Sequence, residues 1–268
     1  MRKLLPVVFA ALMVGAPFAV QAQTTPTQAA EDEAAKNARQ ARTALDAMVK
    51  ALGGDAWLNI KNQMQQGHLA GFYNGAPDPG TTKFWNFHAW PDQDRIEFTA
   101  HRDVLQFYAG REGWEVTYRG KKALPKEQVD EFLRRRDHSI ETAIKVWLKD
   151  PKTILVYEGQ HLAERHLAEQ VTLISAENEA VTILMDVQTH LPLQRTFEWR
   201  DPVYKDKNLD VEEYDDYHLV DGLPTAYTIT RFKGSDMTRQ MFLDKVIYNQ
   251  SLAPDFWNVD AAAHRVKK

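Results

Sequence analysis

The clearest pattern in the chain is an alternation of apolar and polar positions between residues 181 and 248. Runs of this kind cover residues 181–187, 193–199, 211–220, 225–232 and 240–248. They are rich in β-branched and aromatic residues, which favour strands, and the gaps between them hold Gly, Pro, Asn or Asp, which favour turns. Because short turns join antiparallel neighbours, the pattern predicts five strands in an antiparallel meander.

Upstream of this meander the pattern predicts two helical regions and further strands. A helix at 31–52 repeats apolar residues at helical spacing and ends before two glycines, Gly53 and Gly54. A pair of helices at 125–149 interrupts the strands and breaks near His138. The additional strands are expected at 64–73, 81–90, 95–100, 104–109, 114–118, 153–157, 162–165 and 171–175. A short aromatic segment at 252–257 is expected to cover an edge of the sheet.

Size and charge restrict the class of protein. The chain has 268 residues, 44% of them hydrophobic and 26% charged, and no repeat or linker divides it. This composition suits one globular domain, which we expect to span residues 31–268. The formal net charge of −4 has the wrong sign for a nucleic-acid-binding protein. We therefore expect no nucleic-acid partner.

The first residues have the pattern of an export signal. Arg2 and Lys3 precede an apolar run at 4–20, and Val20-Gln21-Ala22 resembles a cleavage site. We expect a signal peptide at 1–22, a disordered tether at 23–30 and a periplasmic location. The chain has no cysteine, which excludes disulfides, thiolate metal sites, a cysteine nucleophile and an acylated cysteine anchor.

Aromatic residues provide the main candidate for a binding site. In the strand at 81–90, Trp85 and Phe87 share one face, while Phe84 and Trp90 share the other. On an open sheet such rings can line an apolar groove, or they can pack against helices as ordinary core. The groove hypothesis names as ligand-binding residues Trp85, Phe87, Phe98, Phe107, Trp114, Trp147 and Phe197.

Other polar clusters are weaker candidates. His161 and His166 lie five residues apart, which in a strand places them on opposite faces, so we predict no metal site. The acidic run at 210–216 could bind calcium or form a solvated edge strand. Arg134, Arg135 and Arg136 could contact lipid headgroups or a partner, or form a helix's solvent face. There is no Gly-x-Ser-x-Gly or phosphate-loop motif, so we predict neither a catalytic residue nor a cofactor.

Three features resemble exported proteins of the lipoprotein-localisation type, the LolA/LolB-like family of outer-membrane lipoprotein-sorting proteins. They are the turn at 186–192, the segments 213–217 and 220–224 together, and Leu52-Gly53-Gly54 followed by Gln66-Gly67. The resemblance covers most of the chain after residue 22. It implies an α+β fold: a large curved antiparallel sheet, an unclosed half-barrel, with helices covering its concave face. In that family the cavity holds acyl chains of lipoproteins or other lipids.

The leading hypothesis is accordingly a non-catalytic periplasmic carrier or binding protein for lipoprotein acyl chains or another lipid-like ligand. A membrane-bound donor or acceptor protein is a possible partner. The alternative is a periplasmic sensor or scaffold that binds a protein partner through the sheet or the helices. A third hypothesis is an enzyme acting on an exported amphiphile, whose sign would be convergent carboxylates or histidines in a pocket.

Overall fold

The computed structural model describes residues 26–163 and 166–266. The predicted signal peptide lies outside the described residues, as does the start of the predicted tether. The chain divides into two units, one ending at Ala35 and one beginning at Lys36. The described part of the first unit, residues 26–35, is the N-terminal part of helix α1 (Pro26–Leu52). Helix α1 therefore begins before the predicted start at Glu31.

The second unit contains one antiparallel sheet, which is curved and not closed. In spatial order the strands run β7-β6-β5-β4-β3-β1-β14-β13-β12-β11-β10-β9-β8, and β2 pairs with β1 off this path. The strands are β1 (Asn62–Tyr73), β2 (Ala76–Pro77), β3 (Thr82–Ala89), β4 (Gln93–Phe98), β5 (Val104–Ala109), β6 (Glu112–Thr117), β7 (Gly120–Ala123), β8 (Ile154–Ala163), β9 (His166–Ile174), β10 (Ala180–Asp186), β11 (Pro192–Arg200), β12 (Lys207–Val220), β13 (Leu223–Lys233) and β14 (Asp236–Tyr248). The predicted fold class is thus confirmed.

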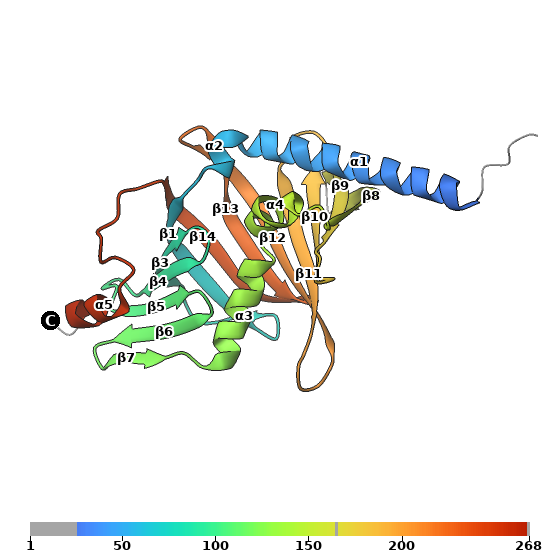
Figure 1. Ribbon diagram of the computed structural model, residues 1–268. Helices are drawn as coiled ribbons and strands as arrows, with labels where there is room; N and C mark the ends of the chain where they lie inside the picture. Colours follow the sequence, from blue (N-terminus) through green and yellow to red (C-terminus); the bar gives the residue numbers. More distant parts are fainter. Residues whose placement is uncertain (1–25, 164–165, 267–268) are drawn as a thin grey trace, which may run out of the picture. The chain divides into compact units, whose positions relative to one another are not determined.

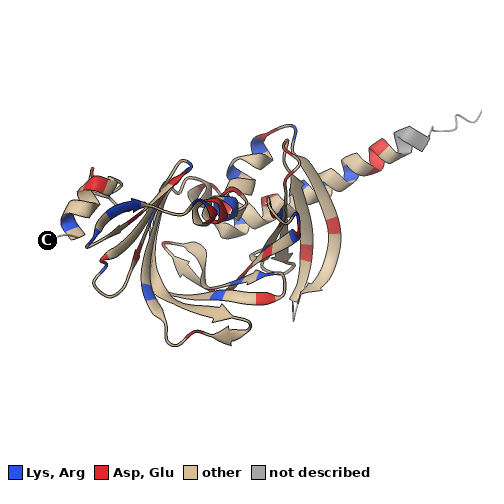
Figure 2. Cartoon of the chain, turned by 90° about the horizontal axis from the view of Figure 1, so that it is seen from below, with Lys and Arg blue, Asp and Glu red and all other residues tan. Residues whose placement is uncertain are grey.

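The position of the helices follows from this strand order. Strands β7 and β8 are consecutive in the sequence but form the two opposite edges of the sheet. The segment between them must therefore cross the whole sheet, and it contains α3 (Lys126–Asp137), α4 (Ile140–Lys145) and the 3-10 turn η1 (Trp147–Lys149). Figure 1 shows α3 and α4 in front of the strands, and Figure 2 shows the strands curving around α3, which is seen end-on. We call the face that these helices cover the front face.

The main core lies where α1 and α4 pack on strands β9 to β11. Its buried residues from the second unit's part of α1 are Ala41, Ala44, Leu45, Met48 and Leu52. They face Ile140, Ala143 and Ile144 of α4 and apolar side chains of the sheet. Helix α2 (Asp55–Leu58) adds Trp57. The 3-4 spacing of apolar residues along α1 therefore predicted this buried stripe correctly.

The back face of the sheet is also covered, by the C-terminal segment. Phe256 packs edge-on against Phe87 with ring centroids 4.8 Å apart, and Arg95 lies over the Phe256 ring at 4.3 Å. Helix α5 (Val259–Val266), which the sequence pattern did not predict, packs Ala262 against Phe107 and its neighbours. The prediction that residues 252–257 cover an edge is wrong, because Phe87 belongs to β3, an interior strand.

Helix α1 also protects the exposed edge strand β8. The Asn37 amide nitrogen donates to the carbonyl of Tyr157 at 2.7 Å, and the Tyr157 amide donates back to the Asn37 side-chain oxygen at 2.8 Å. Unpaired backbone groups at a sheet edge can otherwise pair with another chain. One side chain thus satisfies both backbone groups of an edge residue.

We expect Asn37→Ala to lower the free energy of unfolding by about 1–2 kcal/mol, because two hydrogen bonds to a strand are lost. Urea unfolding measures this loss. Gln40→Ala, an exposed position on the same helix, is the control and should change stability by less than about 0.5 kcal/mol. Equal stabilities of the two variants would contradict the protective role of Asn37.

Candidate functional site

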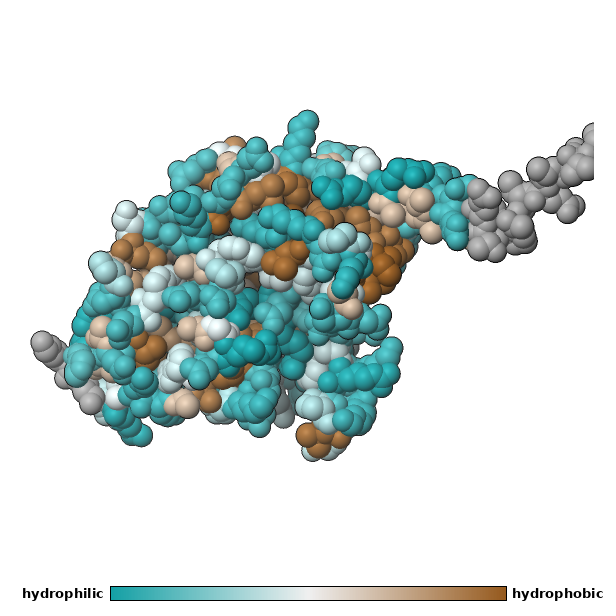
Figure 3. Space-filling model, in the orientation of Figure 1, coloured by the Kyte–Doolittle hydropathy of each residue, from teal (hydrophilic) through white to brown (hydrophobic). Residues whose placement is uncertain are grey.

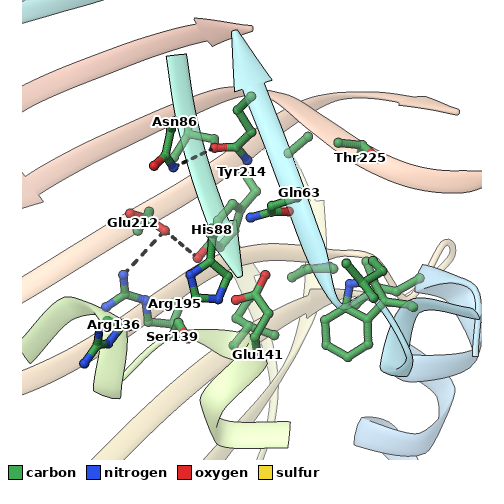
Figure 4. Close-up of a pocket in the computed structure, with 18 of the residues that line it drawn as sticks. Gln63, Asn86, His88, Arg136, Ser139, Glu141, Arg195, Glu212, Tyr214 and Thr225 are labelled. Atoms are coloured by element: carbon green, nitrogen blue, oxygen red, sulfur yellow. Dashed lines mark hydrogen bonds and ion pairs between the residues drawn. The ribbon is translucent and has the colours of Figure 1, made fainter. Parts of the chain in front are cut away.

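A cavity of about 260 Å³ lies between the front face and the helices. Its lining comes from strands β1, β3, β4 and β11–β14 of the sheet, from α3 and α4, and from the α1–α2 region. Figure 4 shows side chains from the strands and from the helical segment converging on the same space. Because its walls come from nearly the whole chain, the cavity exists only in the folded unit.

One part of the wall is apolar. Trp57 and Ile140 line it from the helices, and Ile229 and Met241 line it from β13 and β14. All four side chains are buried, with 9% exposure or less. Ligand sites are commonly concave, mainly apolar and supplied with a few polar groups. This part of the cavity can therefore take up an apolar chain.

Next to Ile229 the wall contains an ion-pair network around Glu212. Its carboxylate accepts from Arg231 Nε at 2.5 Å and from the Tyr214 hydroxyl at 2.8 Å, and it lies 3.4 Å from Arg195 Nη2. Burial would raise the pKa of Glu212, but the cations of Arg231 and Arg195 outweigh it and lower this pKa to about 2. Glu212 is thus a carboxylate at any physiological pH.

A second polar group joins the sheet to α3. His88 Nδ1 lies 2.7 Å from an oxygen of Asp94, and Arg136 of α3 lies 3.3 Å from the other oxygen. Arg136 also donates to the carbonyl of Gly110 at 2.8 Å. These contacts hold α3 across strands β3 to β5. The helix is therefore attached to the sheet by polar contacts at the border of the cavity.

The side chains of β1 and β3 between these regions are uncharged and polar. The Asn86 amide donates to Gln65 at 3.3 Å, and Gln63 lies next along β1 (Figure 4). At the far side, the Tyr217 hydroxyl donates to the carbonyl of Pro192 at 2.7 Å. Burial raises the pKa of Tyr217, so this hydroxyl keeps its proton.

The structure divides the seven sequence-predicted groove residues between two faces of the sheet, and none of them lines the cavity. Gln65 pairs with Asn86, and both line the cavity, so the alternating Trp85 and Phe87 point to the back face. Phe107 and Trp114 follow Phe87 in register across β4 and belong to the same face.

The other three residues are on the front side but outside the cavity lining. Phe98 packs with Phe84 on strands β3 and β4. Phe197 is buried in the main core, where its ring stacks on His138 at 4.4 Å. Trp147 of η1 contacts His138 edge-on at 5.5 Å. The cavity is lined instead by polar residues of β3, such as Asn86 and His88.

The arginine run and the acidic run also differ from their predicted places. Arg135 and Arg136 line the cavity, and Arg134 lies over the Trp199 ring at 3.6 Å, so this side of α3 is not a solvent face. The acidic run belongs to β12, which lies between β11 and β13 and is not an edge strand. The interpretation of the run as a solvated edge is therefore wrong.

No group of three or more His, Asp or Glu residues suited to a metal ion occurs within residues 26–163 and 166–266. His161 contacts the carbonyl of Glu158, whereas His166 contacts Asp186. The two histidines therefore have different partners at the β8–β9 hairpin.

The cavity does bring together Ser139, His88 and Asp94, the residue types of a hydrolytic triad. Ser139, however, is the N-cap of α4: its Oγ accepts from the Thr142 amide at 3.1 Å and donates to the Thr142 hydroxyl at 3.1 Å. A nucleophilic serine must instead give its proton to the base. The observed bonds thus assign Ser139 to helix capping.

Known proteins resemble this chain in fold but not in sequence. No protein-family model matches the chain, and no curated protein matches it by sequence. A DUF1329 family protein from Desulfovibrio piger has a similar structure, with a TM-score of 0.57 and 11% identity over 83% of this chain and 98% of that one. A LolA superfamily protein from Nitrosomonas europaea gives 0.54, with 9% identity over 82% and 98%. This chain has a LolA-like fold.

A third similar structure is a putative outer membrane lipoprotein-sorting protein domain from Vibrio parahaemolyticus. Its TM-score is 0.53, with 9% identity over 83% of this chain and 99% of that one. At such identities the similarity concerns the fold alone. The predicted resemblance is thereby confirmed at the level of the LolA-like fold. No helix among the described residues is long and apolar enough to cross a membrane.

Proposed function

We propose that this chain is a periplasmic carrier or binding protein for a lipid-like amphiphile, which it holds between the front face and the helices. The cavity of about 260 Å³ is the observation that supports this function most directly. Its buried apolar wall removes a chain from water, which is worth roughly 25 cal/mol per Å² of apolar surface. Binding of this kind needs neither a cofactor nor a covalent step.

The size of the cavity restricts the ligand. Sites for small molecules commonly have volumes of about 300–1,000 Å³, so this cavity, at about 260 Å³, lies just below that range. One apolar chain with a small head suits it better than a lipid with several chains. The similarity of the fold to a putative lipoprotein-sorting domain agrees with a lipid-like ligand.

Exposed apolar residues at one end of the sheet favour a protein contact in addition. Figure 3 shows hydrophobic surface over α4 and the β8–β10 end of the sheet. Ile154 and Leu162 of β8 and Val146 after α4 are each at least half exposed. This surface suits a membrane-bound donor or acceptor of the ligand. In the sensor or scaffold alternative, the protein would function only by binding a partner through this surface.

The test is ligand capture by the mature protein, purified without detergent from a Gram-negative periplasm and examined by native mass spectrometry. We expect lipid-like adducts on the wild type. Gln65→Trp should remove them, because the new ring occupies the cavity. Gln66→Trp is the matched control: Gln66 pairs with Trp85, so its side chain points to the back face. The adducts should persist in Gln66→Trp.

The opposite result, adducts lost in Gln66→Trp and kept in Gln65→Trp, would place the groove on the face of Trp85 and Phe87. A wild type that has no adduct and takes up no added lipid would exclude a carrier. It would leave the protein-contact alternative.

A further inference from the structure

The charge of the cavity differs from that of the whole chain. The chain has a formal net charge of −4. Among the residues that line the cavity, the cationic ones are Lys61, Arg135, Arg136, Lys145, Arg195 and Arg231, and the anionic ones are Asp94, Glu141 and Glu212. Cationic side chains thus outnumber carboxylates in the lining of a negatively charged protein. A cationic concave site attracts anions.

Arg195 is the most completely enclosed of these cations. It is 2% exposed, and its Nε and Nη1 have no hydrogen-bond partner. Its remaining nitrogen, Nη2, lies 3.4 Å from Glu212 (Figure 4). Glu212 is bound more closely by Arg231. One carboxylate is therefore shared by two guanidinium groups, and a buried cation without its own counter-ion is costly.

Most other carboxylates near this end have partners of their own, and Glu141 of α4, which also lines the cavity, lies near enough to help raise the pKa of the Tyr214 hydroxyl. Asp94 is occupied by His88 and Arg136, and Glu131 of α3 by Arg135. Asp210, two residues before Glu212 on β12, accepts a hydrogen bond from the Trp199 indole at 2.8 Å. Arg195, Arg231 and Arg135 thus share two carboxylates, Glu212 and Glu131.

A further pair of cations faces the same end. Arg231 and Arg239 are directly opposite in the register of β13 and β14, an arrangement in which like charges repel. Burial, together with the nearby Arg231 and Arg135, lowers the pKa of Arg239 to about 10. Figure 4 places Arg195 and Arg136 at one side of the cavity and the α1–α2 region, in pale blue, at the other. The arginines therefore lie at one end of the cavity, and Trp57 lies at the other, where Lys145 Nζ is 5.4 Å from its ring centroid.

We propose that the cavity selects an amphiphile with a negatively charged head, a carboxylate or a phosphate monoester, which Arg195, Arg231 and Arg135 bind while the chain lies along the wall near Trp57. The proposal rests on the proposed function and specifies its ligand class. Guanidinium groups suit such heads because they donate two parallel hydrogen bonds to carboxylate or phosphate oxygens. The head would also supply the negative charge that this buried end lacks.

The test compares ligands with the same chain and different heads. Lauric acid, lauryl phosphate, lauryl alcohol and lauryl trimethylammonium are titrated into delipidated protein at neutral pH, with inorganic phosphate as a head without a chain. We expect the two anionic amphiphiles to bind at least about tenfold more tightly than the alcohol, as charge-assisted hydrogen bonds require. The cationic amphiphile should bind most weakly, and inorganic phosphate more weakly than lauryl phosphate.

Two variants test which arginines cause the preference for an anionic head. Arg195→Met removes the enclosed cation, while Glu212 keeps Arg231 and Tyr214 as partners. Arg135→Gln removes a cation from α3, whose side chain is 20% exposed, and tests the site if Arg195→Met fails to fold. Each should reduce the preference for lauric acid over lauryl alcohol and leave alcohol binding nearly unchanged. Arg111→Met, at a 77% exposed side chain outside the cavity, is the control.

The outcomes separate this proposal from the one on which it rests. Equal affinity for acid and alcohol would overturn the anionic head and leave the carrier function in place. An anionic preference that both folded variants retain would also overturn it, because the arginines named would not be the site. If no amphiphile binds the wild type, the proposed function itself fails.

Discussion

Glu212→Gln is expected to lower the free energy of unfolding by about 3–5 kcal/mol, because it leaves two arginines without a counter-ion in the fold. Arg195 and Arg231 both depend on this carboxylate. Urea unfolding at neutral pH measures the loss. Glu198→Gln on the neighbouring strand β11 is the matched control: Glu198 is 63% exposed and pairs with Lys207, so its loss should be below about 1 kcal/mol.

The same carboxylate makes stability depend on pH in acid. The pKa of Glu212 is about 2 in the fold and 4.5 as the ordinary value. Because the folded pKa is lowered, the unfolded chain binds the proton more readily. The stabilisation of about 3 kcal/mol is fully present above the ordinary pKa and is lost as the pH falls towards about 2.

Wild type and Glu212→Gln should therefore converge in stability as the pH is lowered from about 5 towards 2. Unfolding curves recorded at several pH values in this range measure the convergence. A constant difference between the two proteins over this range would show that Glu212 titrates normally in the fold. A loss below about 1 kcal/mol at neutral pH would show that the network contributes little net stability.

Phe197→Ala is expected to cost about 3–5 kcal/mol, the usual range for a large buried ring. Phe197 is 2% exposed in the main core, between the His138 ring and the Arg195 guanidinium, whose carbon lies 5.0 Å from the ring centroid. Phe197→Leu, which keeps most of the volume, should cost less than about 1.5 kcal/mol. Thermal and urea unfolding of the two variants measure the difference.

The pair of variants also tests whether Phe197 contacts the ligand, as the groove hypothesis predicts. In the structure it lies outside the cavity lining. Phe197→Leu should therefore bind lauryl alcohol, whose head does not depend on the Arg195 guanidinium beside this ring, as tightly as the wild type while being less stable. A clear loss of affinity in a folded Phe197→Leu protein would instead make this ring part of the binding site.

The strands and their approximate ends were predictable from local pattern. Residues 181–187 and 225–232 lie within β10 and β13 almost residue for residue, because alternation and turn residues act over a few positions. The helix pair between 125 and 149 was predictable for the same reason. Helix α5 was not predictable, because it is short and its apolar residues are buried only by packing against Phe107 and its neighbours on the back face.

The candidate site was not predictable in the same way. Alternation shows that Trp85 and Asn86 point to opposite faces, but it does not show which face the helices cover. That depends on the pairing of β1 with β14, residues far apart in the sequence. The pairing leaves β7 and β8 as edges and takes α3 and α4 across one face. Trp85 and Phe87 of β3 point to the back face, whereas the polar Asn86 and His88 of the same strand line the cavity.

The sequence by itself determined the class of fold, since periodicity, turn residues and helix ends depend on near neighbours along the chain. It also indicated the LolA-like fold through turn and packing motifs. Only the tertiary structure decided where the cavity lies and what charge it carries. Glu212 pairs with Arg195 on β11 and with Arg231 on β13, both adjacent strands, but Arg135 comes from α3 and reaches the same cavity only because the helix crosses the sheet. Desolvation and shared counter-ions arise only when such residues meet, so the chemistry of the site is a property of the fold.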